Sequence, residues 1–414
     1  MRFHQRRAPL GTRVQRTYRN ETVSFLLFAA LVSSISVAHA DDGLGLKRSG
    51  NASDVSISGI SSGAAMAVQY AVGHSGSTVG VGSIAGPPWG CADGSASQAI
   101  NKCMCGRQSP DNKVNEARQL AASGKIDNLS SSNKPLWLSR SFVFQSPADA
   151  TVVEKSGKAN IAFLSSFIGN NSEVDFGNAV DGSNKAGHGI IAPDSHNESC
   201  QADGTETTYI RYCGAEDNAG KMFHALYDDP GSPFDPSQRV NNIPESEVWQ
   251  FDQQHLIDQV KPGTKVAPDT IWWWFWTFPS ERRKNFDMAE KGYIYVPPSC
   301  RVSGSACRVH IALHGCKQDV KNFANRAGYN NWAEHYKVIV VYPAIEPSAS
   351  LSEEACQAPP VNSAFDELPI KLNPNGCWDW WGYLDPSGQK DRYLTKASPQ
   401  MRVIEGIIAE VTSQ

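Results

Sequence analysis

The sequence predicts an α/β protein whose central, mostly parallel sheet is covered by helices on both faces. Two continuous apolar runs, at residues 308–313 and 338–342, are typical of parallel strands buried on both faces. Apolar β-type runs alternate along the chain with helical patterns, as in doubly wound α/β folds. At residues 55–72 a glycine-flanked serine joins a strand pattern to an alanine-rich helical pattern, which points to the same class.

The hydrophobic pattern gives the expected elements in chain order. Strands are predicted at residues 55–60, 79–85, 142–144, 173–180, 292–296, 308–313 and 338–342. Helices are predicted at residues 62–72 and near 158–168, and a one-sided apolar stripe predicts a last helix at residues 404–411. From about residue 196 to 286 the pattern is irregular and rich in Trp, so we expect an insertion or a connecting segment there.

The first 40 residues have the pattern of a secretory signal peptide. An Arg-rich front precedes a short apolar core at residues 25–32 (FLLFAALV), and Ala38-His39-Ala40 matches a cleavage site. That core is too short to span a membrane, and no later segment reaches transmembrane length. We therefore expect a secreted protein, extracellular or periplasmic, with no membrane partner and one catalytic domain at residues 41–414.

Charge and cysteine content exclude several classes of function. The net charge of −4 becomes more negative without residues 1–40. A negative chain of this kind lacks the positive charge that binding to nucleic acid requires. All ten cysteines follow residue 40, and an even count in an exported chain predicts disulfides. Short separations suggest the pairs Cys200–Cys213 and Cys300–Cys307. Cys103-x-Cys105 has the wrong spacing for a zinc site, and no metal or other cofactor is expected.

Gly59-Ile60-Ser61-Ser62-Gly63 is the strongest chemical motif. At a tight turn from strand to helix, small residues are needed on either side, and the turn pushes the serine side chain out of the sheet. An ordinary glycine-rich turn would read the same in isolation. The strand before it and the helix after it favour Ser61 as a nucleophile.

A nucleophilic serine needs a base, and the base needs an acid that orients it. In this class the acid and then the histidine follow the serine, each on a loop after a strand. Asp149 follows the strand at 142–144, and His188 follows the strand at 173–180. Their position favours them over these competitors: Asp127, Asp181, His74, His196 and His224.

The oxyanion loop is predicted near the other end of the chain. The buried strand at 308–313 runs into His314-Gly315-Cys316, a pattern whose amides can stabilise an oxyanion. The expected donors are the N–H groups of Ser62 and Cys316. Because the usual hydrolase order places this loop before the serine, the sequence predicts a circularly permuted α/β-hydrolase.

These residues resemble the secreted, circularly permuted poly(3-hydroxybutyrate) depolymerases with a single catalytic domain. The resemblance is carried by GISSG, GYIYVPPSC, CRVHIALHGC, KQDVKNFANRAGYNNWAEHYKVIVVYP and GCWDWWGY. It covers much of residues 54–190 and nearly all of 287–410. Two parts differ from the family pattern: the acid loop QSPADATVV, and the segment IWWWFWTFP at 271–279, which could be a lid, an adsorbing patch or core.

The resemblance implies hydrolysis of a solid or oligomeric 3-hydroxyalkanoate through an acyl-enzyme. It implies Ser61, Asp149 and His188 as the triad, and a disulfide between Cys316 and Cys377. Trp381, with its neighbours Trp380 and Trp378, would line the substrate crevice. We expect a monomer whose partner is the polyester. A feruloyl or acetyl-xylan esterase, a non-catalytic polymer-binding protein and, more remotely, a secreted peptidase remain alternatives.

Overall fold

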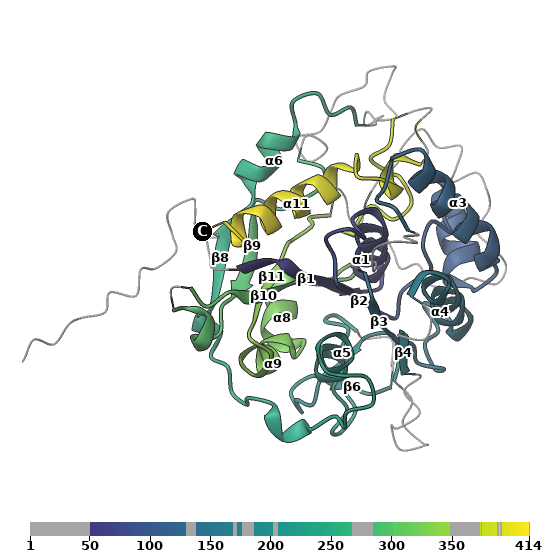
Figure 1. The fold of residues 1–414 in the computed structure, drawn as a ribbon. Helices are drawn as coiled ribbons and strands as arrows, with labels where there is room; N and C mark the ends of the chain where they lie inside the picture. Colours follow the sequence, from purple (N-terminus) through teal and green to yellow (C-terminus); the bar gives the residue numbers. More distant parts are fainter. Residues whose placement is uncertain are drawn as a thin grey trace, which may run out of the picture. The chain divides into compact units, whose positions relative to one another are not determined.

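An eight-stranded sheet lies at the centre of the computed structural model (Figure 1). The structure describes residues 50–129, 138–168, 172–175, 186–201, 206–266, 285–302, 304–347, 373, 375–386, 389 and 391–413. The strand order is β4-β3-β2-β1-β10-β11-β9-β8. The strands from β4 to β11 run parallel, while β9 and β8 are antiparallel to their neighbours.

The strands of this sheet agree closely with the sequence prediction. They are β1 (Gly50–Ile60), β2 (Gly80–Ile84), β3 (Arg140–Phe144), β4 (Ser172–Asp175), β8 (Val248–Asp252), β9 (Lys291–Tyr295), β10 (Cys307–Leu313) and β11 (Val338–Tyr342). The predicted α/β class with a mostly parallel sheet is confirmed. β8 was not predicted, and the predicted strand at 173–180 is described only up to Asp175.

Helices cover both faces of the sheet, as expected for a doubly wound fold (Figure 1). One hydrophobic core packs under α1 (Ser62–Gly73), α3 (Pro110–Ala122), α4 (Glu154–Ile168), α6 (Gln254–Val260) and α11 (Pro399–Val411). A second core packs under α5 (Asn218–Tyr227), α8 (Val320–Arg326) and α9 (Tyr329–Tyr336). Among the residues that the structure describes, no helix is both long and apolar enough to cross a membrane.

The central strand β1 has one apolar face and one polar face, both buried. Val55 and Ile57 enter the first core, whereas Ser56 and Ser58 point to the opposite face. There they flank the imidazole of His310 from β10, with Ser56 Oγ 2.7 Å from Nδ1 and Ser58 Oγ 2.8 Å from Nε2. Burial lowers the pKa of His310 to about 3. The imidazole is therefore a neutral part of the core.

The segment that the sequence predicts as irregular contains regular elements in its described part. Besides α5, β8 and α6, a small parallel sheet has the order β5-β7-β6, with β5 (Ile190–Ile191), β6 (Glu198–Ser199) and β7 (Ile210–Tyr212). Asp217 starts α5 by accepting the amide N–H of Gly220 at 3.0 Å. The Trp-rich stretch at 271–279 lies outside the described residues.

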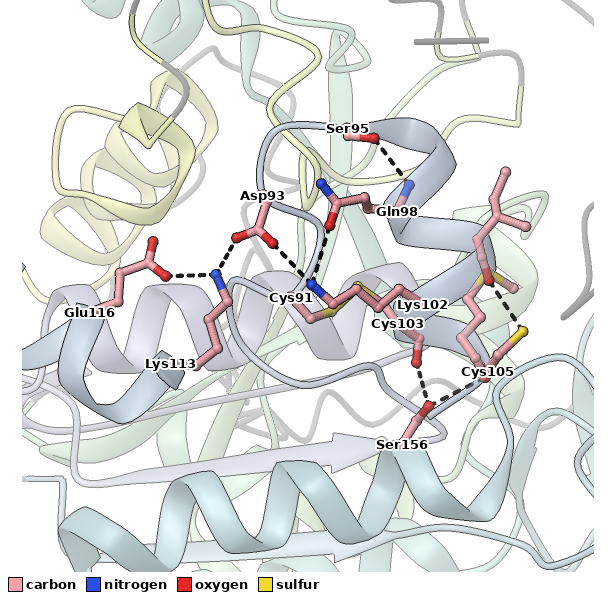
Figure 2. Close-up of a disulfide and its surroundings, with 12 residues drawn as sticks. Cys91, Asp93, Ser95, Gln98, Lys102, Cys103, Cys105, Lys113, Glu116 and Ser156 are labelled. Carbon is pink, nitrogen blue, oxygen red and sulfur yellow. Dashed lines mark hydrogen bonds and ion pairs between the residues drawn. A yellow bond between two sulfur atoms is a disulfide. The ribbon is translucent and has the colours of Figure 1, made fainter. Parts of the chain in front are cut away.

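Three disulfides match the pairs expected from spacing or from the family resemblance. They are Cys200–Cys213, Cys300–Cys307 and Cys316–Cys377. A fourth bridge joins Cys91 to Cys103 (Figure 2). Disulfides of this number are typical of proteins that fold in an oxidising compartment.

The Cys91–Cys103 bridge lies in a segment for which the sequence pattern predicts neither a strand nor a helix. Its second half is helical, with α2 (Ala96–Gln98) followed by the π-helix η1 (Ala99–Met104). Figure 2 shows Asp93 paired with both Lys102 and Lys113, beside the disulfide. These ion pairs fasten the helical segment to the first turn of α3.

Candidate active site

Ser61 lies at the sharp turn between β1 and α1. Its backbone has φ 55° and ψ −118°, a conformation that is strained for a residue with a side chain. Two hydrogen bonds hold the turn: Ser61 N–H donates to Ile84 O at 2.9 Å, and Ala65 N–H donates to Ser61 O at 3.0 Å. This is the strand–serine–helix geometry that the GISSG motif predicts.

The glycines of the motif are required by close backbone contacts. A Cβ on Gly63 would lie 2.3 Å from the carbonyl oxygen of Leu313 and 2.4 Å from that of His314. A Cβ on Gly59 would lie 2.4 Å from the carbonyl carbon of Gly63. The serine turn is therefore packed directly on the end of β10 and the loop that follows it.

Asp149 and His188 lie together, as the sequence predicts. His188 Nδ1 is 2.8 Å from Asp149 Oδ2, and the exposed fractions of the two residues are only 6% and 4%. Because a carboxylate accepts hydrogen bonds, the proton of the imidazole is placed on Nδ1 and the Nε2 lone pair is left as a base. This is the orientation that an acid gives to a catalytic histidine.

The carboxylate of Asp149 is held by three further donors. Its Oδ1 accepts the backbone N–H groups of Thr151 and Val152, both at 2.9 Å. Gln145, at the end of β3, donates from Nε2 to Asp149 Oδ2 at 3.3 Å and to Val152 O at 2.7 Å. With both oxygens occupied, the carboxylate has a single orientation toward His188.

The competing residues that the structure describes lie in other environments. His74 is buried and stacked on Tyr70, with its pKa lowered to about 4 by burial. His196 is exposed and pairs with Asp194. Asp127 accepts a hydrogen bond from the N–H of Gly76. His224 pairs with Asp228, with its Nδ1 2.7 Å from the carboxylate. Asp181 lies outside the described residues.

His314 shapes the loop beneath the serine turn. Its Nδ1–H donates to Gly315 O at 2.8 Å, and its Nε2 accepts the N–H of Ile345 at 3.0 Å. Burial lowers the pKa of His314 to about 4, so the ring is neutral and its tautomer is set by these two contacts. A Cβ on Gly315 would lie 3.3 Å from Cβ of Ser61, so the loop passes directly beside the serine.

Gln318 is a residue of this loop that sequence reasoning missed. Its Oε1 accepts the N–H of Gly315, and its Nε2 donates to Thr208 O, each at 2.5 Å. Thr208 precedes Tyr209, whose ring packs edge-on against His188 with centroids 5.9 Å apart. Gln318 therefore links the loop after β10 to the segment beside the histidine, a long-range contact that leaves no local pattern.

The Trp-rich loop at residues 376–383 (GCWDWWGY) lies against the same region but is largely buried. Trp378 has no exposed surface, and its Nε1 donates to His314 O at 3.0 Å. Trp380 and Trp381 keep exposed fractions of 7% and 9%. The fully buried Trp378 supports the loop after β10 through this hydrogen bond. The Cys316–Cys377 disulfide fixes the two loops to each other.

The described residues contain no group of three or more His, Cys, Asp or Glu that could hold a metal ion. A strained serine, a histidine oriented by a carboxylate and a glycine-containing loop packed against the serine turn are compatible with nucleophilic acyl transfer.

Comparisons with known proteins find relatives of one kind. The chain is 27% identical over 365 residues to the poly(3-hydroxybutyrate) depolymerase of Delftia acidovorans, which covers 86% of the chain and 59% of that relative. It is 32% identical over 130 residues to the polyhydroxybutyrate depolymerase of Talaromyces funiculosus, covering 30% of the chain and 34% of the relative. No protein-family model matches.

Two solved structures share the fold. A PHB depolymerase variant complexed with an R3HB trimer matches with a TM-score of 0.65 and 22% identity, over 89% of this chain and 99% of that one. The crystal structure of the PHB depolymerase from Penicillium funiculosum matches with a TM-score of 0.63 and 23% identity, over the same shares. The chain spans 59% and 34% of the lengths of the two curated relatives.

Proposed function

We propose, from the membership of this chain in the poly(3-hydroxybutyrate) depolymerase family, that it is a serine esterase acting on poly(3-hydroxybutyrate) or its oligomers. The observation that carries the proposal is the 2.8 Å contact between His188 and Asp149, on loops that follow the serine turn in the order of a hydrolase triad. The solved relative that holds an R3HB trimer supports an oligomeric polyester as the ligand.

In the proposed first half-reaction, His188 Nε2 takes the proton of Ser61 Oγ while Oγ attacks the ester carbonyl carbon. The carbonyl oxygen becomes an oxyanion. We assign its stabilisation to the N–H groups of Ser62 and Cys316, because Gln318 already occupies the N–H of Gly315. Collapse of this intermediate breaks the bond to the alcohol, which leaves with the proton from His188. Water then releases the acyl group by the same steps.

We assign the substrate wall to Trp381 and Trp380, which keep some exposed surface, and exclude the buried Trp378. A polyester chain offers few hydrogen-bond donors, so aromatic area is the physically reasonable contact. We further propose that the chain is secreted, that residues 1–40 are its signal peptide, that residues 41–414 form one catalytic domain, and that it acts as a monomer. The disulfides support an oxidising compartment.

The strand order supports a circularly permuted α/β-hydrolase. If β8–β11 stood before β1, the sheet would read 1-2-4-3-5-6-7-8 and the loop after the third strand would carry His314-Gly315. That is the place of the oxyanion loop in α/β-hydrolases. The two ends of the described chain also lie together, since a Cβ on Gly50 would be 2.8 Å from Val411 O. Ends in contact are what a permuted chain requires.

Turbidity of a poly(3-hydroxybutyrate) suspension tests the proposal, with a soluble short-chain nitrophenyl ester assayed in parallel. The wild type is expected to clear the suspension, and Ser61→Ala and His188→Gln are expected to leave it turbid. His196→Gln is the matched control, because that histidine is exposed and outside the site. Cleavage of the soluble ester without clearing of the suspension would support esterase activity but contradict the polyester as substrate. Carbohydrate esters would then be the next substrates to test. No activity on either would favour a binding protein.

A further inference from the structure

Arg211 is a fully buried arginine next to the proposed catalytic histidine. It lies on β7, the middle strand of the small sheet, with an exposed fraction of 1%. Its Nε and Nη2 both donate to the backbone carbonyl oxygen of His188, at 3.1 and 2.9 Å. Its Nη1 donates to Ser199 O at 3.3 Å. Three of its donors are thus used on backbone carbonyls of the loop before β5 and of strand β6.

The contact with His188 is tightly packed. A Cβ on Gly189 would lie 2.8 Å from Cγ of Arg211 and 3.1 Å from Nε, so only glycine lets the arginine side chain lie against this peptide. Glu206 Oε1 is 3.2 Å from Nη2 and partly balances the buried charge. The Cys200–Cys213 disulfide closes the segment around the small sheet.

A buried cation is costly unless its surroundings satisfy it, and an apolar side chain of similar volume is often as stabilising. An arginine at this place is therefore better explained by what it fixes than by fold stability alone. What it fixes is the carbonyl of His188, whose ring must meet Asp149 at 2.8 Å while its Nε2 stays free. A planar guanidinium that donates twice to one oxygen restrains both position and direction.

We infer that Arg211 is a positioning residue for the catalytic base, acting through the backbone of His188. The inference rests on the proposed function, because it assigns Arg211 to the histidine of the proposed triad. A small displacement of this peptide would carry the imidazole out of its contact with Asp149. Displacements of about 1 Å in catalytic groups can cost about 10²-fold in rate.

The test compares Arg211→Met, Arg211→Lys and Arg239→Met on a soluble nitrophenyl ester. Arg239 is the matched control: it is also shielded and ion-paired, through Nε to Asp217 Oδ2 at 3.0 Å, but does not contact His188. Competent sites are counted by exhaustive labelling with a fluorophosphonate, which reacts at the nucleophilic serine. Turnover is then expressed per labelled site, so that loss of folded protein does not lower it.

Arg211→Met is expected to lose about 10- to 100-fold in kcat per labelled site, with KM within about twofold. Arg211→Lys is expected to recover part of this loss, because an ammonium can still donate to His188 O. Arg239→Met is expected to turn over per site like the wild type, even if its Tm falls. A merely structural role for Arg211 would give wild-type kcat per labelled site in all three variants, which would overturn the inference.

If Arg211→Met does not fold, Arg211→Lys decides alone, and wild-type kcat per site in that variant overturns the inference. His188→Gln is assayed beside them. Activity in His188→Gln would refute the proposed triad itself, whereas an inactive His188→Gln with a fully active Arg211→Met would refute only the role of Arg211.

Discussion

Gly63 and Leu313 are in such close contact that a methyl group on Gly63 would stand 2.3 Å from the carbonyl oxygen of Leu313. Gly63 is in the first turn of α1, and Leu313 ends β10, so the helix that follows Ser61 is packed on the strand that leads into the proposed oxyanion loop. The spacing between the proposed nucleophile and its proposed oxyanion donors is therefore set by one backbone packed against another.

Gly63→Ala should separate these two backbones. We expect it to lower the free energy of unfolding by about 3 kcal/mol or more. The new methyl group would collide with the carbonyl oxygens of Leu313 and His314, which cannot move without distorting the end of β10. Gly73→Ala, in the same helix, is the control: its Cβ would meet only Met401 Sδ at 3.7 Å, and it should be neutral or stabilising by up to about 1 kcal/mol. Urea unfolding of both variants measures the difference. Equal effects would contradict the argument.

Asp149→Asn should remove catalysis while leaving the fold intact. An amide is isosteric, but its NH₂ would face the imidazole and favour the wrong tautomer, with an expected loss of about 10³–10⁴-fold in kcat. The control is Asp127→Asn, whose carboxylate contacts Gly76 N–H and Lys396 instead. Kinetics on a soluble ester decide, and a loss of less than about tenfold in Asp149→Asn would exclude it as the acid of the triad.

Removing the Cys316–Cys377 disulfide should affect stability and activity together. The bridge spans 61 residues, so the double serine variant should lose about 4 kcal/mol by loop-closure entropy, and the oxyanion loop would lose one anchor. Removing Cys300–Cys307, which spans 7 residues, should cost about 2 kcal/mol and leave kcat unchanged. Equal kcat values for the two double variants would contradict a role of the longer bridge at the site.

Two buried histidines predict how stability depends on pH. Burial lowers the pKa of His310 to about 3 and of His314 to about 4, from an ordinary value near 6.5. Between these values the unfolded chain binds more protons than the folded one, so stability is full above about pH 6.5 and falls as the pH drops. In that pH range each histidine should lower the free energy of unfolding by about 1.4 kcal/mol for each unit that the pH falls.

His310→Gln isolates one of these contributions. The amide can still bond to Ser56 and Ser58 but does not titrate, so the slope of unfolding free energy between pH 6 and 5 should fall by about 1.4 kcal/mol per unit. His196→Gln, at an exposed histidine, should leave the slope unchanged. Urea titrations at several pH values measure it. An unaltered slope in His310→Gln would show that the folded imidazole is not held neutral.

The contact between Gly50 and Val411 makes the proposed permutation testable. A chain that starts at Gly231, passes from residue 413 through a short linker to Gly50 and ends at residue 230 restores the hydrolase strand order. Nothing lies within 4 Å of a Cβ on Gly231, so new ends should be tolerated there. We expect this variant to fold and to keep kcat within about tenfold. Failure to fold would count against interchangeable ends.

The sequence predicts the parallel core of this fold well because buried parallel strands are apolar along their whole length. The strand at 308–313 and its neighbour at 338–342 were found for this reason, and the loops after β3 and β4 followed from chain order. α5 was not found, since it lies among Asp, Pro and Gly residues and has no strong boundary signal in the sequence. Its cap, Asp217, becomes apparent only from the contact with Gly220.

At the site, local motifs identified the residues that carry the proposed chemistry but not those that hold them. Gln318 and Arg211 act on backbone atoms far away in the chain, and such bonds produce no periodic pattern. The Trp-rich loop at residues 376–383 shows a second limit of prediction from sequence. A run of aromatic residues indicates apolar contact, but it does not tell which indole faces inward, and the structure places Trp378 wholly inside.

The pairing of β1 with β10 also has a consequence for biosynthesis. The ribosome makes the serine turn before it makes β10 and the loop beneath the turn. A nascent or prematurely terminated chain that stops before Cys307 lacks the strand that completes one side of β1. The proposed nucleophile would then have no second oxyanion donor, so such translation products are expected to be inert, and hydrolytic competence arises only after β10 and the loop that follows it have been translated.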